Sequence, residues 1–453
     1  MNPSFRRRLA ASLLALACSC FTRVEAAPAN RPNIVFIMAD DLGWGDVGFH
    51  GGNAPTPHLD RLAREGLELA AHYVAPVCSP TRTGLMTGRC WSRFGVTNPQ
   101  NERALPWDTL TLPRALKSVG YDTALIGKWH LGSLPEQGPN RFGFDHAYGS
   151  LAGGVSPYSH KYKKGQFSET WHRNGKLLSE EGHVTDLLTR EAVTWLESRG
   201  DRPFFLYVPY TAVHLPVREP DEWVARVPAG ITGEVARHYA ASIMHLDDGV
   251  GRILAALERT GRRANTLVVF TSDNGGSTAQ NNDTTYPDDR CPTGPLPGRN
   301  TPWRGKKGDL HEGGIRVPTV VSWPGRARPG RVEAPVQITD WLPTFAALTD
   351  FKPSSDPKWD GTTIGGLLTQ HAAPAERPLY SVAPGWRARS VRLGNWKLIV
   401  SGDGAKATHE VYNLAADPAE KTNLATAQPD RLRDLLATLA RVSARDRDAL
   451  PKD

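Results

Sequence analysis

The stretch Arg31–Asp46, with the sequence RPNIVFIMADDLGWGD, decides the fold class expected for this chain of 453 residues. Residues 34–38 are apolar without interruption, which is the pattern of a strand buried on both faces of a parallel sheet. The strand leads directly into Asp40 and Asp41. Adjacent carboxylates are unfavourable unless something cationic holds them, and hard cations such as Ca²⁺ and Mg²⁺ take oxygen ligands. We therefore expect either a divalent-cation site or an exposed acidic turn after this strand.

Three later apolar runs also end in polar or titratable residues. These runs and the residues that follow them are 121–126 with Lys128 and His130, 204–208 with His214, and 265–271 with Asp273 and Asn274. Segments with apolar residues at helical spacing separate the runs, namely 57–66, 112–119, 183–199 and 234–260. Strands that alternate with helices predict an α/β fold with a mostly parallel, doubly wound sheet. Ligands bind outside the carboxyl ends of the strands in such sheets, so we expect these side chains to form one site.

Asp247 and Asp248 form a second acidic pair, but they lie inside the helical segment 234–260. Adjacent residues on a helix point roughly a third of a turn apart, which is unfavourable for holding one ion between them. We interpret this pair as part of a solvated face or as an acceptor for backbone N–H groups.

The composition changes near residue 351, where a cluster of Pro and Ser over 353–357 indicates a linker. Beyond it the sequence predicts short strands at 379–382, 390–393, 396–400 and 410–413, and a helix at 429–442. We expect a large α/β domain over 27–350. A smaller subdomain over 351–453 is expected to be an antiparallel sheet with a terminal helix.

Residues 1–26 have the pattern of an export signal. Arg6–Arg8 precede a short apolar run over 9–21, and small residues up to Ala26 offer a cleavage site. We expect removal of this signal peptide and export of the mature chain to the periplasm or the cell exterior, or to the lysosome in a eukaryote. No apolar run in the sequence is long enough to span a bilayer, so no membrane span is predicted.

The net charge of +7 suits either a polyanionic substrate or nucleic acid. Nucleic acid is the weaker option, because the sequence has no zinc-finger spacing and no Lys/Arg block outside the signal peptide. Of the five cysteines, Cys18 and Cys20 leave with that peptide. Besides Cys78, Cys90 and Cys291 remain, and both a disulfide between them and two separate buried thiols stay open in an oxidising compartment.

The sequence CSPTRTGLMTGR, residues 78–89, is the stretch most typical of chemistry. Pro80 favours a first helical turn, so a helix is predicted to begin beside a loop that holds Cys78. The N-terminus of such a helix directs backbone N–H groups and partial positive charge at an anion, and Arg82 lies one turn further on. The stretch indicates a reactive residue beside a fixed cation, although free cysteines are also among the most buried residues.

The run Cys-x-Pro-x-Arg followed by Thr-Gly-x-x-Thr-Gly-Arg resembles the signature of the type I sulfatases. Counterparts of that family's metal and catalytic residues follow in the same order: Asp40-Asp41, Gly127-Lys128-Trp129-His130, His214, Asp273-Asn274-Gly275-Gly276 and Lys307. The resemblance implies an alkaline-phosphatase-like fold and a sulfuric ester hydrolase. It also implies that a formylglycine-generating enzyme oxidises Cys78 to Cα-formylglycine, whose hydrated aldehyde is the nucleophile.

The resemblance further implies a role for each residue of the site. One Ca²⁺ per chain would be held by Asp40, Asp41, Asp273, Asn274 and an oxygen of the modified Cys78. The catalytic residues would be Cys78, Arg82, Lys128, His130, His214 and Lys307. The lysines would bind sulfate oxygens, and His214 or Lys307 would protonate the departing alcohol. His130 would accept a proton from the second hydroxyl at position 78. For both histidines, a structural role with a hydrogen bond to the backbone is the other interpretation.

Residues 40–51 and 158–160 most resemble the branch that contains N-acetylgalactosamine-4-sulfatase, which implies a sulfated carbohydrate or an aryl sulfate as substrate. The candidates to stack on a sugar and to pair with its acidic groups are His160, Trp171, Trp386 and Arg387. An ordinary solvent-facing loop is the other interpretation of these positions. Two further functions stay open: a phosphomonoester or phosphonate hydrolase of the same superfamily, and a sulfated-glycan receptor in which Cys78 is never oxidised.

Overall fold

β1 (Asn33–Ala39) is a central strand of a ten-stranded sheet. It pairs in parallel with β8 (Phe204–Pro209) on one side and with β9 (Thr266–Ser272) on the other. β4 (Asp122–Lys128) continues the parallel part beyond β8. The computed structural model describes residues 31–451, and in it the carboxyl ends of these four strands share one edge. The mostly parallel α/β sheet predicted from the sequence is confirmed.

The whole sheet has the strand order β11-β2-β10-β9-β1-β8-β4-β5-β6-β7. Its other strands are β2 (Leu67–Leu69), β5 (His146–Ser150), β6 (Trp171–Arg173), β7 (Lys176–Leu177), β10 (Val320–Ser322) and β11 (Gly330–Val332). β10 and β6 run antiparallel to their neighbours β9 and β5. A separate parallel pair consists of β3 (His72–Tyr73) and β12 (Val336–Gln337).

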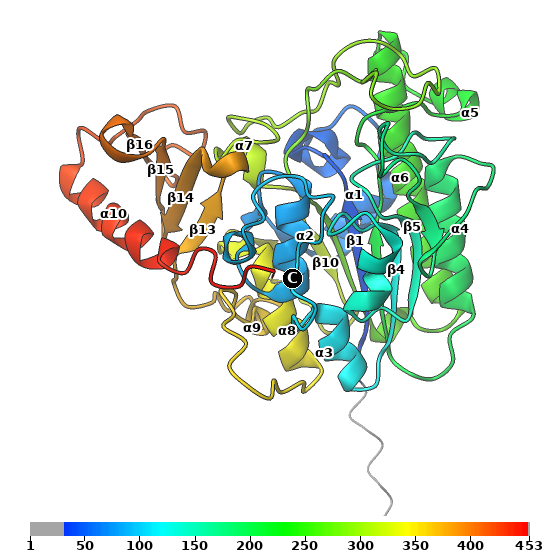
Figure 1. Cartoon of the computed structure of the whole chain (residues 1–453), viewed down its shortest axis with the longest axis horizontal. Coiled ribbons are helices and arrows are strands. Elements are labelled where there is room, and N and C mark those ends of the chain that lie inside the picture. Colours follow the sequence, from blue (N-terminus) through cyan, green and yellow to red (C-terminus); the bar gives the residue numbers. More distant parts are fainter. Residues whose placement is uncertain (1–30, 452–453) are drawn as a thin grey trace, which may run out of the picture. The chain divides into compact units, whose positions relative to one another are not determined.

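Helices cover both faces of the ten-stranded sheet (Figure 1). They are α1 (Pro57–Glu65), α2 (Cys78–Thr87), α3 (Leu112–Ser118), α4 (Val184–Glu197), α5 (Asp221–Ala225), α6 (Glu234–Arg259), α7 (Glu312–Ile315), α8 (Trp341–Leu348) and α9 (Gly365–Gln370). On β1, Ile34, Phe36 and Met38 join the apolar cluster of α2, α3 and α8. The alternate residues, Val35, Ile37 and Ala39, join the cluster of α1, α4 and α6. This alternation explains the uninterrupted apolar run, because both faces of the strand are buried.

The C-terminal sheet is antiparallel, as predicted. Its strands are β13 (Leu379–Val382), β14 (Ala388–Leu393), β15 (Trp396–Ser401) and β16 (Thr408–Asn413), and α10 (Pro429–Ser443) packs on β14 and β15. The buried ammonium of Lys397 on β15 connects this sheet to helix α7. Its Nζ lies 2.9 Å from Oε1 of Glu312 on α7 and 2.8 Å from Oε1 of Glu420. Apolar residues from both regions also share one cluster. The boundary at residue 350 stays a prediction.

The predicted start of α2 needs a correction. Cys78 is the first residue of α2 and not part of a preceding loop, because Val77, with extended backbone (φ −147°, ψ 163°), is already the N-cap.

Asp247 accepts hydrogen bonds from the backbone N–H groups of His58 (3.1 Å) and Leu59 (2.8 Å) at the start of α1. The interpretation of Asp247 as a backbone acceptor is therefore confirmed.

Cys90 and Cys291 are both free thiols. Cys90 is buried, where Ser92 Oγ donates to its sulfur (3.3 Å), and Cys291 is half-buried. The structure therefore agrees with two separate thiols and not with a disulfide between Cys90 and Cys291.

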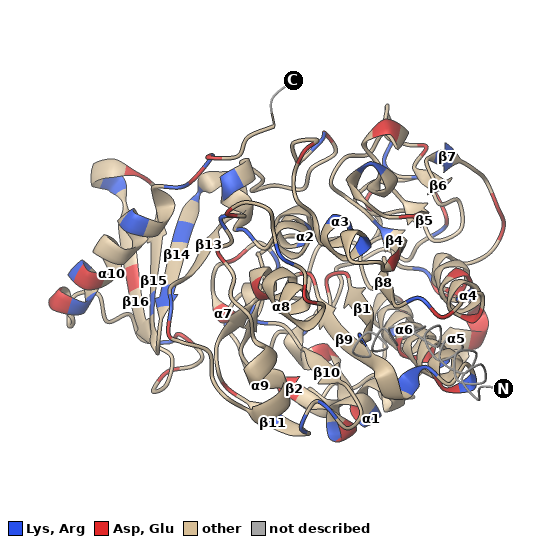
Figure 2. Ribbon diagram, turned by 90° about the horizontal axis from the view of Figure 1, so that it is seen from below, with Lys and Arg blue, Asp and Glu red and all other residues tan. Residues whose placement is uncertain are grey.

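Charged residues are spread over the surface elements. Figure 2 shows Lys and Arg interspersed with Asp and Glu along the helices and the C-terminal sheet. Within residues 31–451, no helix combines the length and the apolar character needed to cross a membrane. The predicted signal peptide lies outside the described residues.

Candidate active site

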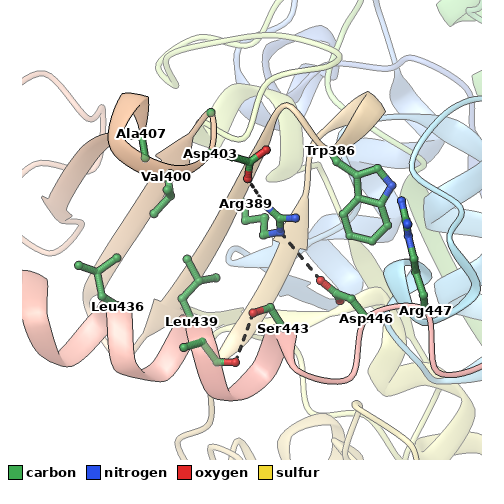
Figure 3. Close-up of a pocket in the computed structure, with 13 residues that line it drawn as sticks. Trp386, Arg389, Val400, Asp403, Ala407, Leu436, Leu439, Ser443, Asp446 and Arg447 are labelled. Atoms are coloured by element: carbon green, nitrogen blue, oxygen red, sulfur yellow. Dashed lines mark hydrogen bonds and ion pairs between the residues drawn. The ribbon is translucent and has the colours of Figure 1, made fainter.

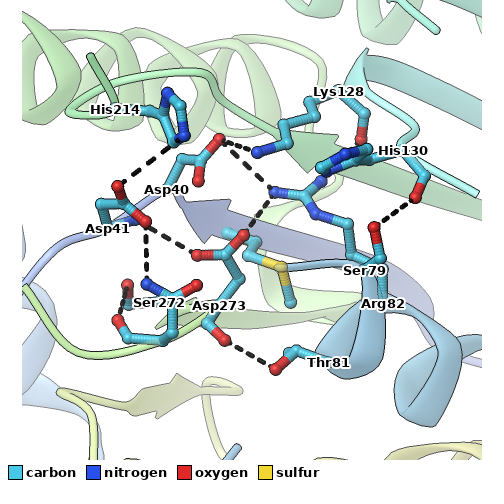
Figure 4. A network of polar contacts seen from close by, with 12 residues as sticks. Asp40, Asp41, Ser79, Thr81, Arg82, Lys128, His130, His214, Ser272 and Asp273 are labelled. Atoms are coloured by element: carbon cyan, nitrogen blue, oxygen red, sulfur yellow. Dashed lines mark hydrogen bonds and ion pairs between the residues drawn. The ribbon is translucent and has the colours of Figure 1, made fainter. Parts of the chain in front are cut away.

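Four adjacent strands bring the predicted site residues to one edge of the sheet (Figure 4). The residues at this edge are Asp40 and Asp41 after β1, Lys128 at the end of β4, His214 after β8, and Asp273 and Asn274 after β9. Main-chain hydrogen bonds fix the ends relative to one another, since Val213 N–H donates to the carbonyl of Asp40 (2.8 Å) and Asp273 N–H to that of Ala39 (3.1 Å). Residues that are far apart in the sequence thus form one site, as expected.

Each carboxylate of this edge contacts a cation. The three pairs are Lys128 Nζ with Asp40 Oδ2 (2.6 Å), Lys307 Nζ with Asp41 Oδ1 (2.7 Å) and Arg82 Nη2 with Asp273 Oδ2 (2.8 Å). Five of these side chains are at most 1% exposed, and only that of Lys307 is accessible, to 20%. Removal from water strengthens the attraction within each pair. Lys307 is therefore the charged group that borders the opening of the site.

Two oxygens at this edge have no hydrogen-bond partner among the described residues, Oδ1 of Asp40 and Oδ1 of Asn274. The amide N of Asn274 donates to Oδ1 of Asp41 (2.8 Å), which turns the amide oxygen away from that carboxylate. Asp40, Asp41 and His214 also offer ligand atoms within 4.8 Å of one another. Buried acceptors are normally satisfied, and carboxylate and amide oxygens suit Ca²⁺. The donor set at this edge therefore fits a hard divalent cation.

The two adjacent acids differ in their electrostatics. Burial raises the pKa of Asp40 to about 8, and the nearby Asp273 adds to this rise. Burial also opposes ionisation of Asp41, but the ammonium of Lys307 and then His214 outweigh it and hold the pKa of Asp41 below its usual range. Asp41 is thus stabilised as a carboxylate. At Asp40, the attraction to Lys128 and Arg82 does not compensate for burial and for the repulsion from Asp273.

Arg82 and two hydroxyl side chains that were not among the predicted site residues hold the first turn of α2 at this edge. Oγ1 of Thr81 donates to the carbonyl of Asp273 (2.6 Å), and Oγ of Ser79 donates to the carbonyl of His130 (2.9 Å). Nη1 of Arg82 donates to the carbonyl of Lys128 (2.6 Å). These bonds hold Cys78, which is 1% exposed, between the ends of β9 and β4. In the sequence, the only signal for these contacts is that the hydroxyl residues Ser79 and Thr81 lie close to Cys78.

The two histidines are bound in different ways. Both ring nitrogens of His130 lack a hydrogen-bond partner among residues 31–451, so the structure does not support a backbone-bonded role for it. His214 bonds through Nδ1 to the carbonyl of Leu215, which assigns the proton to Nδ1 and leaves Nε2, 3.8 Å from Oδ2 of Asp41, as an acceptor. Burial holds the pKa of both rings well below the usual value, and Lys128 and Lys307 add to the shift. Both rings are therefore neutral bases at neutral pH.

Comparison with known proteins agrees with this geometry. A family model described as Sulfatase matches residues 32–351. The chain belongs to the sulfatase family. Arylsulfatase J of Mus musculus is 31% identical over 92% of this chain and 77% of its own length, and N-acetylgalactosamine-6-sulfatase of Mus musculus is 34% identical over 86% and 75%. The crystal structure of Ps i-CgsB in complex with k-i-k-neocarrahexaose superimposes with a TM-score of 0.82 at 31% identity, covering 93% of this chain and 95% of that one. This sulfatase is a sulfuric ester hydrolase, and its alkaline-phosphatase-like fold is confirmed.

Two of the predicted substrate residues of the sulfatase are buried. His160 and Trp171 are each 3% exposed, and their rings stack on each other with centroids 4.8 Å apart. His160 Nε2 contacts the carbonyl of Gly182 (3.0 Å), and Trp171 Nε1 donates to Glu180 (2.7 Å). Neither ring offers a free face to a ligand in this structure. The role of these two residues in substrate binding stays a prediction.

The other two candidates lie on the C-terminal subdomain of the sulfatase. Arg387 is exposed and donates to the carbonyl of Gly308, next to Lys307, so it borders the accessible side of the catalytic site. Trp386 instead faces a groove beside α10, between Arg389 and Arg447 (Figure 3), whose guanidinium carbons lie 5.4 and 4.9 Å from its ring. Arg387 is thus bound next to Lys307, whereas Trp386 lines the groove beside α10, and a role of either residue in substrate binding stays a prediction.

A second group of potential metal ligands in the sulfatase, His183, Glu219 and His245, already has protein partners. Nδ1 of His245 contacts Glu219 (2.7 Å), and its Nε2 contacts Asp186 (3.2 Å). Nε2 of His183 donates to the carbonyl of Arg218 (3.1 Å), while its Nδ1 accepts from the N–H of residue 185 (3.3 Å). Since each ring nitrogen is satisfied, this cluster is a hydrogen-bonded network between α4, α6 and the chain after β8.

Proposed function

We propose that this sulfatase removes a sulfate ester from a carbohydrate, with Cα-formylglycine at position 78 as the nucleophile and one Ca²⁺ beside it. The observation that carries the proposal is the buried edge at which three acids, three cations and two unpartnered oxygens lie around the side chain of Cys78. A sulfate ester needs its oxygens neutralised, a nucleophile for the sulfur and a proton for the leaving alcohol. This edge has a group for each need.

Oxygen chemistry at position 78 fits the site better than a thiol does. The ion would be held by Asp40, Asp41, Asp273 and Asn274, together with an oxygen of residue 78. When bound, Ca²⁺ supplies positive charge to the nucleophile and to a sulfate oxygen. Burial raises the pKa of the Cys78 thiol, which therefore keeps its proton and is a poor ligand for a hard ion. This mismatch supports conversion of Cys78 by a formylglycine-generating enzyme during maturation.

The surrounding side chains have the remaining roles. Lys128 and Lys307 bind the sulfate oxygens, on which charge develops during the reaction. Arg82 is fixed by two acceptors and holds the hydroxyl groups of residue 78 in place. Lys307, which keeps its proton, or His214, once it has taken up a proton at Nε2, gives a proton to the departing alcohol. His130 accepts a proton from the second hydroxyl of residue 78, which releases sulfate and restores the aldehyde.

The names of the relatives support a carbohydrate substrate. One relative is an N-acetylgalactosamine-6-sulfatase, and one solved neighbour contains a neocarrahexaose. The resemblance of residues 40–51 makes the 4-sulfate of N-acetylgalactosamine the first candidate and the 6-sulfate the second. We also propose export of the mature chain, from the signal-peptide pattern of residues 1–26.

Two measurements test this function. The mass of the Cys78 peptide should correspond to an aldehyde in place of the thiol. A panel of N-acetylgalactosamine 4-sulfate and 6-sulfate, 4-nitrophenyl sulfate and 4-nitrophenyl phosphate should release sulfate and little phosphate, and Cys78→Ala should release neither. Preferred release of phosphate would favour a phosphomonoester hydrolase. An unconverted thiol in native protein that binds sulfated glycans without turnover would favour a receptor, and either result would overturn the proposal.

A further inference from the structure

One segment that borders the catalytic site does not come from the strand ends. Gly153 and Gly154, which follow β5, lie directly against the two catalytic histidines. A Cβ atom at Gly153 would lie 2.3 Å from Cε1 of His130, and one at Gly154 would lie 3.1 Å from Nδ1 of His214. The same point at Gly154 is 2.9 Å from the hydroxyl of Tyr286. A side chain at 153 or 154 would therefore collide with these groups, and the hydroxyl of Tyr286 lies next to Gly154 on the Nδ1 side of His214.

The hydroxyl of Tyr286 has no hydrogen-bond partner among residues 31–451, although the residue as a whole is largely buried. The residue is 4% exposed, and its contacts in the described chain are made by its ring and main chain: a T-shaped contact with Tyr162 (centroids 5.6 Å apart), Nζ of Lys163 at 5.4 Å over the ring, and a bond from its N–H to Asp283. Burial raises the pKa of Tyr286 well above its usual value, so the hydroxyl keeps its proton. Buried tyrosine hydroxyls normally find a partner, and a group that lacks one beside a pocket is placed to bind a ligand.

Two loops hold Tyr286 rigidly in this position. Lys164 N–H donates to the carbonyl of Thr285 (2.8 Å), and Ser156 Oγ donates to that of Pro287 (3.1 Å). At the end of the loop, one oxygen of Asp289 accepts from the N–H groups of Tyr158 (2.9 Å) and Ser159 (3.0 Å). The segments 156–164 and 282–289 thus form one hydrogen-bonded wall. A donor that is fixed before binding loses little conformational freedom when the ligand arrives.

We propose that Tyr286 recognises the sugar on the leaving-group side, by donating a hydrogen bond to the sugar oxygen nearest the sulfate ester. The inference rests on the proposed function, in which His214 is a candidate to protonate the leaving alcohol. The Tyr286 hydroxyl lies near the Nδ1 side of His214, and we assign it to the alcohol part of the substrate because His214 is a candidate to protonate that alcohol. On a pyranose, a second oxygen lies next to the ester, either a hydroxyl on the adjacent carbon or the ring oxygen. An aryl sulfate without a substituent next to the ester, such as 4-nitrophenyl sulfate, has no such oxygen.

A comparison of two substrates in three proteins tests this assignment. Tyr286→Phe keeps the ring and its contact with Tyr162 but removes the donor. The control is Tyr158→Phe, which removes a hydroxyl from the same wall at a ring that packs on His183 (5.3 Å). The substrates are 4-nitrophenyl sulfate and the better of N-acetylgalactosamine 4-sulfate and 6-sulfate. Tyr286→Phe should lower kcat/KM for the sugar by about 10- to 100-fold, as expected when a site loses a hydrogen bond to its substrate. Its kcat/KM for the aryl sulfate should stay within about twofold, and Tyr158→Phe should change neither.

The alternative results have separate meanings. Equal loss on both substrates, or no loss on the sugar, would overturn the assignment of Tyr286 and leave the sulfatase activity itself intact. If the wild-type protein with a verified aldehyde at position 78 hydrolyses neither sulfate, the proposed function fails instead. A melting temperature of Tyr286→Phe equal to that of the wild type would show that the loss on the sugar is not a loss of folded protein.

Discussion

The free energy of unfolding should depend on pH through His245, a buried histidine between two carboxylates. Burial disfavours its charged form, but the hydrogen bonds to Asp186 and Glu219 outweigh burial and raise the pKa of His245 to about 9. The other groups that face this ring keep their charge state above pH 6.5. The pKa values of Glu219 and Asp186 are lowered, that of His183 is lowered too, and Trp223, stacked at 4.5 Å, does not titrate.

The size and the sign of this effect follow from the shift. A free histidine has a pKa of about 6.5, and each unit of difference corresponds to about 1.4 kcal/mol. The charged ring of His245 therefore stabilises the folded state by up to about 3 kcal/mol. Because the folded pKa is raised, this contribution is complete below about pH 6.5, decreases as the pH rises and is lost above about pH 9.

Urea unfolding of the wild type and of His245→Gln at pH 6, 7, 8 and 9.5 measures this contribution. The difference in unfolding free energy should narrow by about 3 kcal/mol from pH 6 to pH 9.5. Asp40 and Asp46, whose pKa values burial raises to about 8 and about 7, titrate in the same window but do so in both proteins and cancel. His409→Gln, at a half-buried histidine of the C-terminal sheet, is the control for the loss of an imidazole outside this cluster. A pH-independent difference for His245→Gln would refute the reasoning.

Three further predictions concern the site and its support. Gly153→Ala places a Cβ atom against the ring of His130 and should lower kcat by about 100-fold or more while the melting temperature changes little; a kcat within threefold of the wild type would contradict the close approach. Lys397→Met leaves the buried carboxylate of Glu420 without its ionic partner and should lower the unfolding free energy by about 3–5 kcal/mol, with partial recovery in the double variant with Glu420→Gln; additive losses in urea unfolding would argue against the pair. Ca²⁺ at 100 times its Kd should stabilise the protein by about 2.7 kcal/mol, and this gain should disappear in Asp40→Asn; equal stabilisation of the two proteins would exclude the ion from this edge.

The fold could be predicted because its central strands are long and buried on both faces. The runs that became β1, β8 and β9 have no polar interruption, and this pattern is insensitive to the details of packing. Strands such as β3 and β7 have two residues each. Their pairing depends on tertiary contacts and leaves no period in the sequence, so these edge elements could not be predicted.

The acids, Lys128 and the histidines of the site could be predicted because each lies at or shortly after the end of a strand at the same edge. Lys307 lies on the long connection after β9 and was indicated only by the family resemblance. The residues on loops were harder. His160 and Trp171 come from a polar sequence segment typical of a solvent-facing loop, but Trp171 begins strand β6. The two rings stack on each other and are buried, and neighbouring carbonyl and carboxylate groups satisfy their polar atoms. Tyr286 was missed because its position depends on bonds between two loops. The adjacent glycines Gly153 and Gly154 were the available signal, since such a pair permits the close approach of other groups to the main chain.

The buried ammonium of Lys397 has a consequence for how this sulfatase can be recombined. This ammonium pairs with Glu312 at the start of α7, shortly after Lys307 in the sequence, and with Glu420 in the C-terminal region. A chimera joined near residue 350 would therefore inherit only part of this triad from each parent. In such exchanges, Glu312, Lys397 and Glu420 should come from a single parent. The composition of the linker near residue 350 is therefore not sufficient to choose the crossover point.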